Sequence, residues 1–131
     1  MPKFIFNKLI RDKLCDEYVR LDQTAEYREL SKVEFSKELA NKIIEEVKEI
    51  PVDGTKEEIT AELADAQQAI DDLMHHHNVT SDDVALVQKK KFDKKGGFSE
   101  GNFVVSLDLK DDDEWVAYYR KSPEKFEEIH E

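Results

Sequence analysis

Two capping boxes constrain the fold of this chain more than any other feature of its sequence. Ser31 is followed by Glu34, and Thr55 by Glu58, so each pair can satisfy free N–H groups at the start of a helix. The connection from Pro51 to Thr55 is short and contains a proline and a glycine, which end the preceding helical pattern. The sequence therefore predicts two antiparallel helices joined by a tight turn.

Hydrophobic periodicity and helix breakers outline the rest of the chain. Four helical segments are expected, at about residues 7–22, 31–50, 55–77 and 80–95. The alternating, β-branched stretch 103–109 is expected to form a strand, and residues 114–129 a short helix followed by a docked tail. We therefore expect one domain over residues 1–131. It would be all-α, with a bundle of about four helices at about 7–95 and a strand and helix appendage at about 98–131.

The composition disfavours several classes of protein. The formal net charge of -11 disfavours binding to DNA or RNA, whose backbones are also anionic. No apolar run approaches the roughly 20 residues of a membrane span, and the single cysteine permits no disulfide within the chain. We expect a cytoplasmic protein that binds neither nucleic acid polymers nor membranes. Because only 39% of the residues are hydrophobic, a homo-oligomer, either a dimer or a tetramer, is expected to supplement a thin core.

Acidic side chains on the two paired helices are expected to share one flank. Each helical residue advances about 100°, which places Glu46 about 60° and Glu49 about 120° from the apolar stripe centred on Ile43. On the next helix, Glu62 and Asp65 lie about 65° and 125° from their own stripe in the same sense. Antiparallel helices with equal offsets turn these flanks to the same side. The four carboxylates should therefore converge at one edge of the core.

Convergent carboxylates of this kind favour a metal site. At the margin of an apolar core they repel one another unless cations lie between them. Mg²⁺ and Mn²⁺ prefer oxygen ligands, and Mg²⁺ keeps positions in its shell for water and substrate phosphates. A solvated acidic face is the alternative, and it is the usual explanation for a single E-x-x-E on a helix. Two acidic pairs with matched offsets favour a metal site that is open to a phosphorylated ligand.

Three motifs resemble those of one enzyme family. The acids spell E-E-x-x-E, then twelve residues, then E-x-x-D, at Glu45, Glu46, Glu49, Glu62 and Asp65. This pattern resembles the motif of the MazG-like, all-α nucleoside triphosphate pyrophosphohydrolases. The stretches NKLIRDKL (7–14) and KFDKKGGF (91–98) are similar to motifs of a phosphoribosyl-ATP pyrophosphohydrolase-like subgroup of that family.

The resemblance implies a MazG-like helical fold and a Mg²⁺-dependent activity in which Mn²⁺ can substitute. Members of the family hydrolyse a nucleoside triphosphate between its α and β phosphorus atoms and release a nucleoside monophosphate and pyrophosphate. For this chain, the resemblance implies a house-cleaning role, in which non-standard or excess nucleoside triphosphates are removed.

The resemblance also implies roles for individual residues. The metal ligands would be Glu46, Glu49, Glu62 and Asp65. Glu45 and Glu46 would be the catalytic acids, with Glu45 holding a second metal ion or orienting the attacking water. Contacts to the substrate phosphates would come from Lys8, Arg11, Lys13, Lys91 and Lys95.

Two alternatives are compatible with the same sequence. One is a phosphoribosyl-ATP pyrophosphohydrolase, because resemblance to that subgroup does not fix the substrate. The other is a non-catalytic acidic helical module that binds a partner. The triplet His75–His77 is interpreted as a helix end, because adjacent helical residues point in different directions and cannot chelate one ion together.

Overall fold

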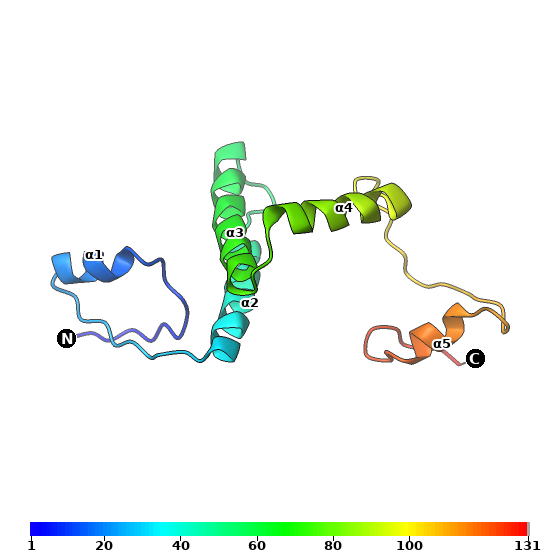
Figure 1. Cartoon of the computed structure of the whole chain (residues 1–131), viewed down its shortest axis with the longest axis horizontal. Coiled ribbons are helices and arrows are strands. Elements are labelled where there is room, and N and C mark those ends of the chain that lie inside the picture. Colours follow the sequence, from blue (N-terminus) through cyan, green and yellow to red (C-terminus); the bar gives the residue numbers. More distant parts are fainter. Residues whose placement is uncertain (131) are drawn as a thin grey trace. The chain divides into compact units, whose positions relative to one another are not determined.

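A computed structural model of the chain describes residues 1–130 and contains helices as its only regular elements there (Figure 1). The helices are α1 (Leu14–Arg20), α2 (Lys32–Lys48), α3 (Lys56–His76), α4 (Ser81–Lys95) and α5 (Trp115–Arg120). None of these five helices is long and apolar enough to cross a membrane. The chain divides into two compact units, Met1–Lys91 and a second that begins at Phe92.

Helices α2 and α3 form the predicted antiparallel hairpin, and both predicted capping boxes are confirmed. The Ser31 hydroxyl accepts a hydrogen bond from the Glu34 backbone N–H at 3.1 Å, and the Glu34 carboxylate accepts one from the Ser31 N–H at 3.2 Å. Thr55 and Glu58 make the same reciprocal pair at 3.2 and 3.4 Å. Figure 1 shows the two helices side by side, and they pack extensively on one another.

The core of the hairpin is thinner than the apolar stripes imply. Its buried apolar side chains are Leu39, Ala66 and Ala69. Val47 lies one turn after Ile43 on the stripe expected to be buried, and Leu63 lies on the corresponding apolar stripe of α3, yet their side chains are 50% and 52% exposed. Within the described residues, α2 and α3 are the only helices that pack extensively on one another. The expected bundle of four helices is therefore reduced, within one chain, to a hairpin of two.

The first predicted helix is shorter than expected. The pattern predicted a helix over residues 7–22, whereas α1 covers only Leu14–Arg20. Asn7 has a left-handed backbone, with φ of 47°, and Asp22 has φ of 55°, so neither end can continue a right-handed helix. Residues before α1 instead bring the basic side chains of Lys8 and Arg11 to the hairpin.

The predicted strand is wrong, whereas the short helix after it is confirmed. Residues 103–109 contain no strand, and the large side chains of Phe103 and Val105 are exposed. A strand needs a partner to hydrogen-bond its backbone, and the described part of the chain supplies no second strand. In the same unit, the docked tail expected after α5 is observed, because the Phe126 ring lies 4.8 Å from that of Tyr119.

The α2–α3 turn depends on the small size of Gly54. A Cβ atom at this position would overlap the Pro51 ring and lie 3.4 Å from the Ile59 side chain. We expect Gly54→Ala to shift the turn and lower the free energy of unfolding by about 1–3 kcal/mol, measured by thermal melting. Gly97→Ala is the matched control, since its Cβ would meet the Phe92 ring at an ordinary 3.5 Å. Equal melting temperatures for the two variants would contradict this prediction.

Candidate metal centre

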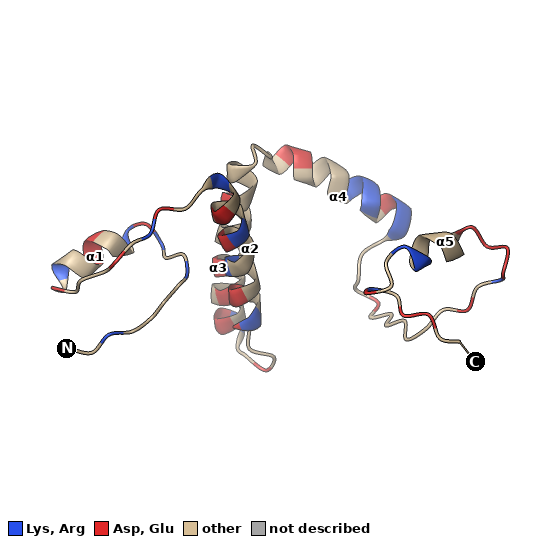
Figure 2. Ribbon diagram, turned by 90° about the horizontal axis from the view of Figure 1, so that it is seen from below, with Lys and Arg blue, Asp and Glu red and all other residues tan. Residues whose placement is uncertain are grey.

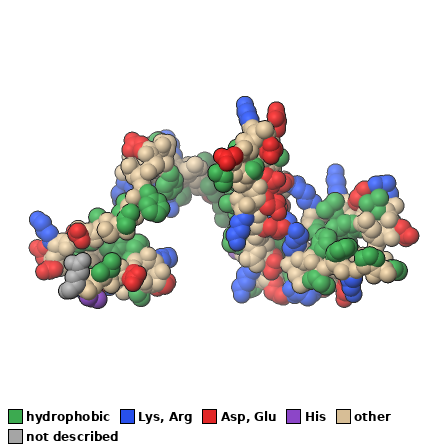
Figure 3. Space-filling model, turned by 180° about the vertical axis from the view of Figure 1, so that it is seen from behind, with side chains coloured by type: hydrophobic (Ala, Val, Ile, Leu, Met, Phe, Trp, Pro, Cys, Tyr) green, Lys and Arg blue, Asp and Glu red, His purple; other side chains and the backbone are tan. Residues whose placement is uncertain are grey.

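Three of the four predicted ligands converge at the turn end of the hairpin. Glu46 lies in the last turn of α2 and Glu49 is its C-cap residue, whereas Glu62 lies in the second turn of α3. Each offers one carboxylate oxygen, and these three oxygens all lie within 4.8 Å of one another. Figure 2 marks the acidic positions along the ribbons of the hairpin, and Figure 3 shows acidic side chains gathered along it. We call Glu46, Glu49 and Glu62 the carboxylate cluster.

The placement of these acids opposes ordinary helix electrostatics. The C-terminus of a helix carries partial negative charge and favours cations, yet Glu45, Glu46 and Glu49 all lie at the C-terminal end of α2. Glu46 is in addition only 8% exposed. Carboxylates that are crowded and buried at the negative end of a helix need positive charge nearby. Lys42 supplies part of it, with its ammonium 3.4 Å from the Glu46 carboxylate and 3.2 Å from that of Glu45.

Glu62, the α3 member of the cluster, is affected both by burial and by neighbouring charges. Its Oε2 atom is buried and has no hydrogen-bond partner. Burial, followed by the charges of Glu49, Asp65 and Glu46, raises the pKa of the Glu62 carboxyl above its ordinary value. A buried oxygen without a donor, facing two further carboxylates, fits a hard divalent cation such as Mg²⁺ or Mn²⁺. The cluster could therefore hold such an ion.

The raised pKa of Glu62 gives a pH-dependent expectation for stability in a metal-chelating buffer. A carboxyl whose folded pKa exceeds its unfolded value, near 4.5, stabilises the fold fully below that value. This contribution is lost as pH rises through the folded pKa. Glu62→Gln lacks the repulsive charge, so its melting temperature should exceed that of the wild type, by a margin that grows as pH rises from about 4.5 and then levels off.

Glu57→Gln is the matched control for Glu62→Gln, because it removes an exposed carboxylate from the same helix. Its melting temperature should follow that of the wild type across the pH range. The difference in melting temperature between Glu62→Gln and the wild type should therefore depend on pH and exceed that of Glu57→Gln. If it does neither, charge repulsion within the cluster does not destabilise the fold.

Asp65, the fourth predicted ligand, lies outside the cluster and is paired with Arg11. The Arg11 Nη2 group donates to Asp65 Oδ1 at 2.6 Å. Lys8 likewise donates to Glu45 at 2.8 Å. The hydrogen bond from Lys8 lowers the pKa of the Glu45 carboxyl, and the same bond raises the pKa of the Lys8 ammonium. Two of the predicted phosphate-binding cations therefore lie beside the acids.

The other three predicted cations belong to the ends of helices α1 and α4. Lys13 is the N-cap residue of α1 and is exposed. Lys91 and Lys95 are exposed in the last turns of α4. The sequence interpretation missed Lys42, which bridges Glu45 and Glu46. Its spacing of three and four residues from these acids on one helix is the signal that could have identified it.

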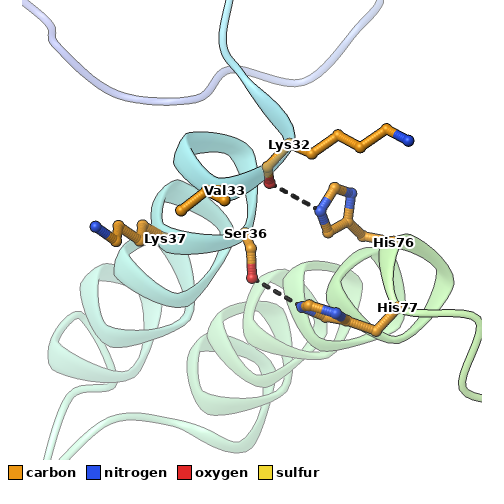
Figure 4. A pocket seen from close by; sticks show the side chains of 6 residues that line it. All are labelled: Lys32, Val33, Ser36, Lys37, His76 and His77. Carbon is orange, nitrogen blue, oxygen red and sulfur yellow. Dashed lines mark hydrogen bonds between the residues drawn. The ribbon is translucent and has the colours of Figure 1, made fainter.

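The two histidines at the end of α3 form hydrogen bonds to α2 at the end of the hairpin away from the turn (Figure 4). The His76 Nε2–H group donates to the Lys32 carbonyl at 3.0 Å, and His77 shares a hydrogen bond of 2.8 Å with the Ser36 hydroxyl. These side chains line a hollow of about 550 Å³ together with Val33 and Lys37. The interpretation of the triplet as a helix end agrees with these contacts, which join α3 to α2.

Comparison of the chain with known protein families, curated proteins and solved structures gave no match. The function is therefore inferred from the carboxylate cluster, from the cations beside it and from the motifs of the sequence.

Proposed function

We propose that the protein is a Mg²⁺-dependent nucleoside triphosphate pyrophosphohydrolase with a MazG-like site. The supporting observation is the carboxylate cluster, in which Glu46, Glu49 and Glu62 converge and one Glu62 oxygen is buried without a partner. Such a group of oxygen ligands suits an ion that must also bind phosphate. The product would be a nucleoside monophosphate and pyrophosphate, in keeping with nucleotide house-cleaning.

The acidic residues would have different roles in this proposal. Glu46, Glu49 and Glu62 would hold the ion, and Asp65, about one helical turn after Glu62 on α3, would be a further ligand. When bound, Mg²⁺ neutralises phosphate oxygens and lowers the pKa of a coordinated water. Glu45 shares Lys42 with Glu46, and in this proposal its carboxylate would orient the attacking water.

Positive charge for the leaving pyrophosphate would come from Lys8 and Arg11. Charge develops on the departing phosphate oxygens during cleavage, and fixed cations nearby stabilise it. The guanidinium of Arg11 can bind two phosphate oxygens at once. Lys13 and Lys91, which belong to the same unit as the cluster, would add further contacts in this proposal.

We also propose that copies of the chain associate, as a dimer or a tetramer, through the hairpin. Ile44, Val47 and Leu63 are each about half exposed, although they project from the helices that form the core. Large apolar side chains that remain open on paired helices favour burial against another subunit. A second hairpin packed on this surface would supply the two helices that a four-helix MazG-like bundle requires.

A product assay over a panel of triphosphates tests the proposed activity. The purified chain is incubated with Mg²⁺ and common, damaged or phosphoribosylated nucleotides, and phosphate is measured with and without added inorganic pyrophosphatase. Phosphate that appears only with pyrophosphatase identifies pyrophosphate as the product. A panel that includes phosphoribosyl-ATP separates that alternative from broader triphosphate hydrolysis. Absence of pyrophosphate with every substrate would refute the proposal and favour a non-catalytic binding module.

A further inference from the structure

Residues 7–13 are tied to the hairpin by two exposed ion pairs. Lys8 contacts Glu45 of α2 at 2.8 Å, and Arg11 contacts Asp65 of α3 at 2.6 Å. The segment lies before α1, has no regular secondary structure, and begins at Asn7 with its left-handed backbone. The Lys8 and Arg11 side chains are 44% and 58% exposed. Ion pairs this exposed are weak and are screened by salt, so their partners can be exchanged.

The two cations lie where they oppose the entry of another cation. Glu45 attracts Lys8 most strongly, and the charges of Glu49 and Glu46 also raise the pKa of the Lys8 ammonium. Lys8 therefore lies within the field of the carboxylate cluster. Arg11 occupies one oxygen of Asp65, the residue whose charge also acts on Glu62. Positive charge at these positions weakens the attraction that the acids exert on a divalent ion.

Both side chains have a better partner in a triphosphate than in a single carboxylate. Arginine binds phosphate through two parallel hydrogen bonds, and lysine binds it as a point charge. If Lys8 leaves, Glu45 keeps a cation, because Lys42 lies 3.2 Å away. If Arg11 leaves, Asp65 is released beside Glu62 on the same helix. The negative charge of the carboxylates can therefore be balanced first by the side-chain cations and then by a metal ion.

We propose that residues 7–13 form a cationic strap whose Lys8 and Arg11 exchange from Glu45 and Asp65 to the phosphates of a Mg²⁺-bound nucleoside triphosphate. The proposal rests on the proposed function and adds a sequence of events to it. The strap competes with a divalent ion when no nucleotide is bound. It closes over the phosphates when metal and triphosphate bind together.

Removal of the two charges should change metal binding and nucleotide binding in opposite directions. In Lys8→Gln/Arg11→Gln, Mn²⁺ titrated without nucleotide and followed by electron paramagnetic resonance should bind on the order of fivefold tighter, because the competing charges are gone. The α,β-methylene analogue of ATP, titrated by calorimetry with Mg²⁺, should bind on the order of tenfold weaker, because the phosphates lose two cations. A strap that merely held the hairpin in shape would weaken both.

The control is Lys3→Gln/Arg20→Gln, which removes one lysine and one arginine from the same part of the chain. Lys3 is exposed, and Arg20 pairs with Glu17 within α1. Both affinities should match those of the wild type. Unchanged or weaker Mn²⁺ binding in Lys8→Gln/Arg11→Gln would overturn the proposal that the strap competes with a divalent ion. The proposed function would still stand if the wild type releases pyrophosphate. A wild type that neither binds the analogue nor releases pyrophosphate overturns the exchange and the proposed function together.

Discussion

Glu46→Gln is expected to abolish pyrophosphate release while leaving the α2–α3 hairpin folded. Glutamine has nearly the same shape as glutamate but lacks its charge, so the cluster would lose the most buried of its three carboxylates. Lys42 would keep Glu45 as a partner, so the substitution leaves no lysine unpaired. Loss of a metal ligand should lower kcat/KM by on the order of 10²-fold or more, since even outer contacts of metal sites cost 10–100-fold.

The measurement compares pyrophosphate release, Mn²⁺ affinity and far-ultraviolet circular dichroism in the wild type and the variant. Glu57→Gln on α3 is the control, because it removes one exposed acid and changes the net charge equally. It should retain full activity. If Glu46→Gln hydrolyses triphosphates at the wild-type rate, the cluster does not hold the catalytic metal and the proposed function fails.

Local sequence rules predicted the hairpin and most of the cluster. Each capping box joins a residue to the one three positions later, so Ser31 and Thr55 fix helix starts without help from distant residues. The rotation of about 100° per residue then carries Glu46 and Glu49 to the flank that Glu62 also occupies. These predictions held because each depends on one helix or on one short turn.

The same rotation placed Asp65 in the cluster, whereas its carboxylate is paired with a cation from a distant segment. Arg11 holds Asp65 from 54 positions away in the sequence, and no local pattern contains that pairing. The strand predicted at 103–109 failed for a similar reason, since strand formation depends on a partner that local propensity cannot reveal. The expected bundle of four helices likewise required contacts beyond the hairpin, which no local pattern contains.

The acids at the end of α2 connect the fold to the proposed chemistry. A sequence selected only for a stable helix would place cations there, as Lys48 does in the last turn. Glu45, Glu46 and Glu49 oppose that preference, and Lys42 compensates only two of them. Residues that break a local rule tend to mark functional sites, where the stability they cost is retained because the chemistry needs it.

Leu39→Ala is expected to cause the largest loss of stability of any single truncation in the hairpin. Leu39 is 4% exposed, and the other buried apolar side chains of the described residues are the small Ala66 and Ala69. Truncation of a buried leucine to alanine costs about 2–5 kcal/mol. Whole domains are stable by only about 5–15 kcal/mol, and a core this thin places the hairpin towards the lower end.

Thermal and urea unfolding of Leu39→Ala would therefore show a strongly lowered midpoint, and Glu46 and Glu49 would lose their register with Glu62. Metal binding should fall together with helicity, in contrast to Glu46→Gln, which should lose metal binding alone. Val33→Ala is the control on the same helix, because Val33 is 65% exposed and its truncation removes little buried surface. Equal midpoints for the two variants would mean that contacts outside this small core hold α2 and α3 together. In that case, the proposed association of copies through the exposed Ile44, Val47 and Leu63, rather than Leu39, would position the carboxylates.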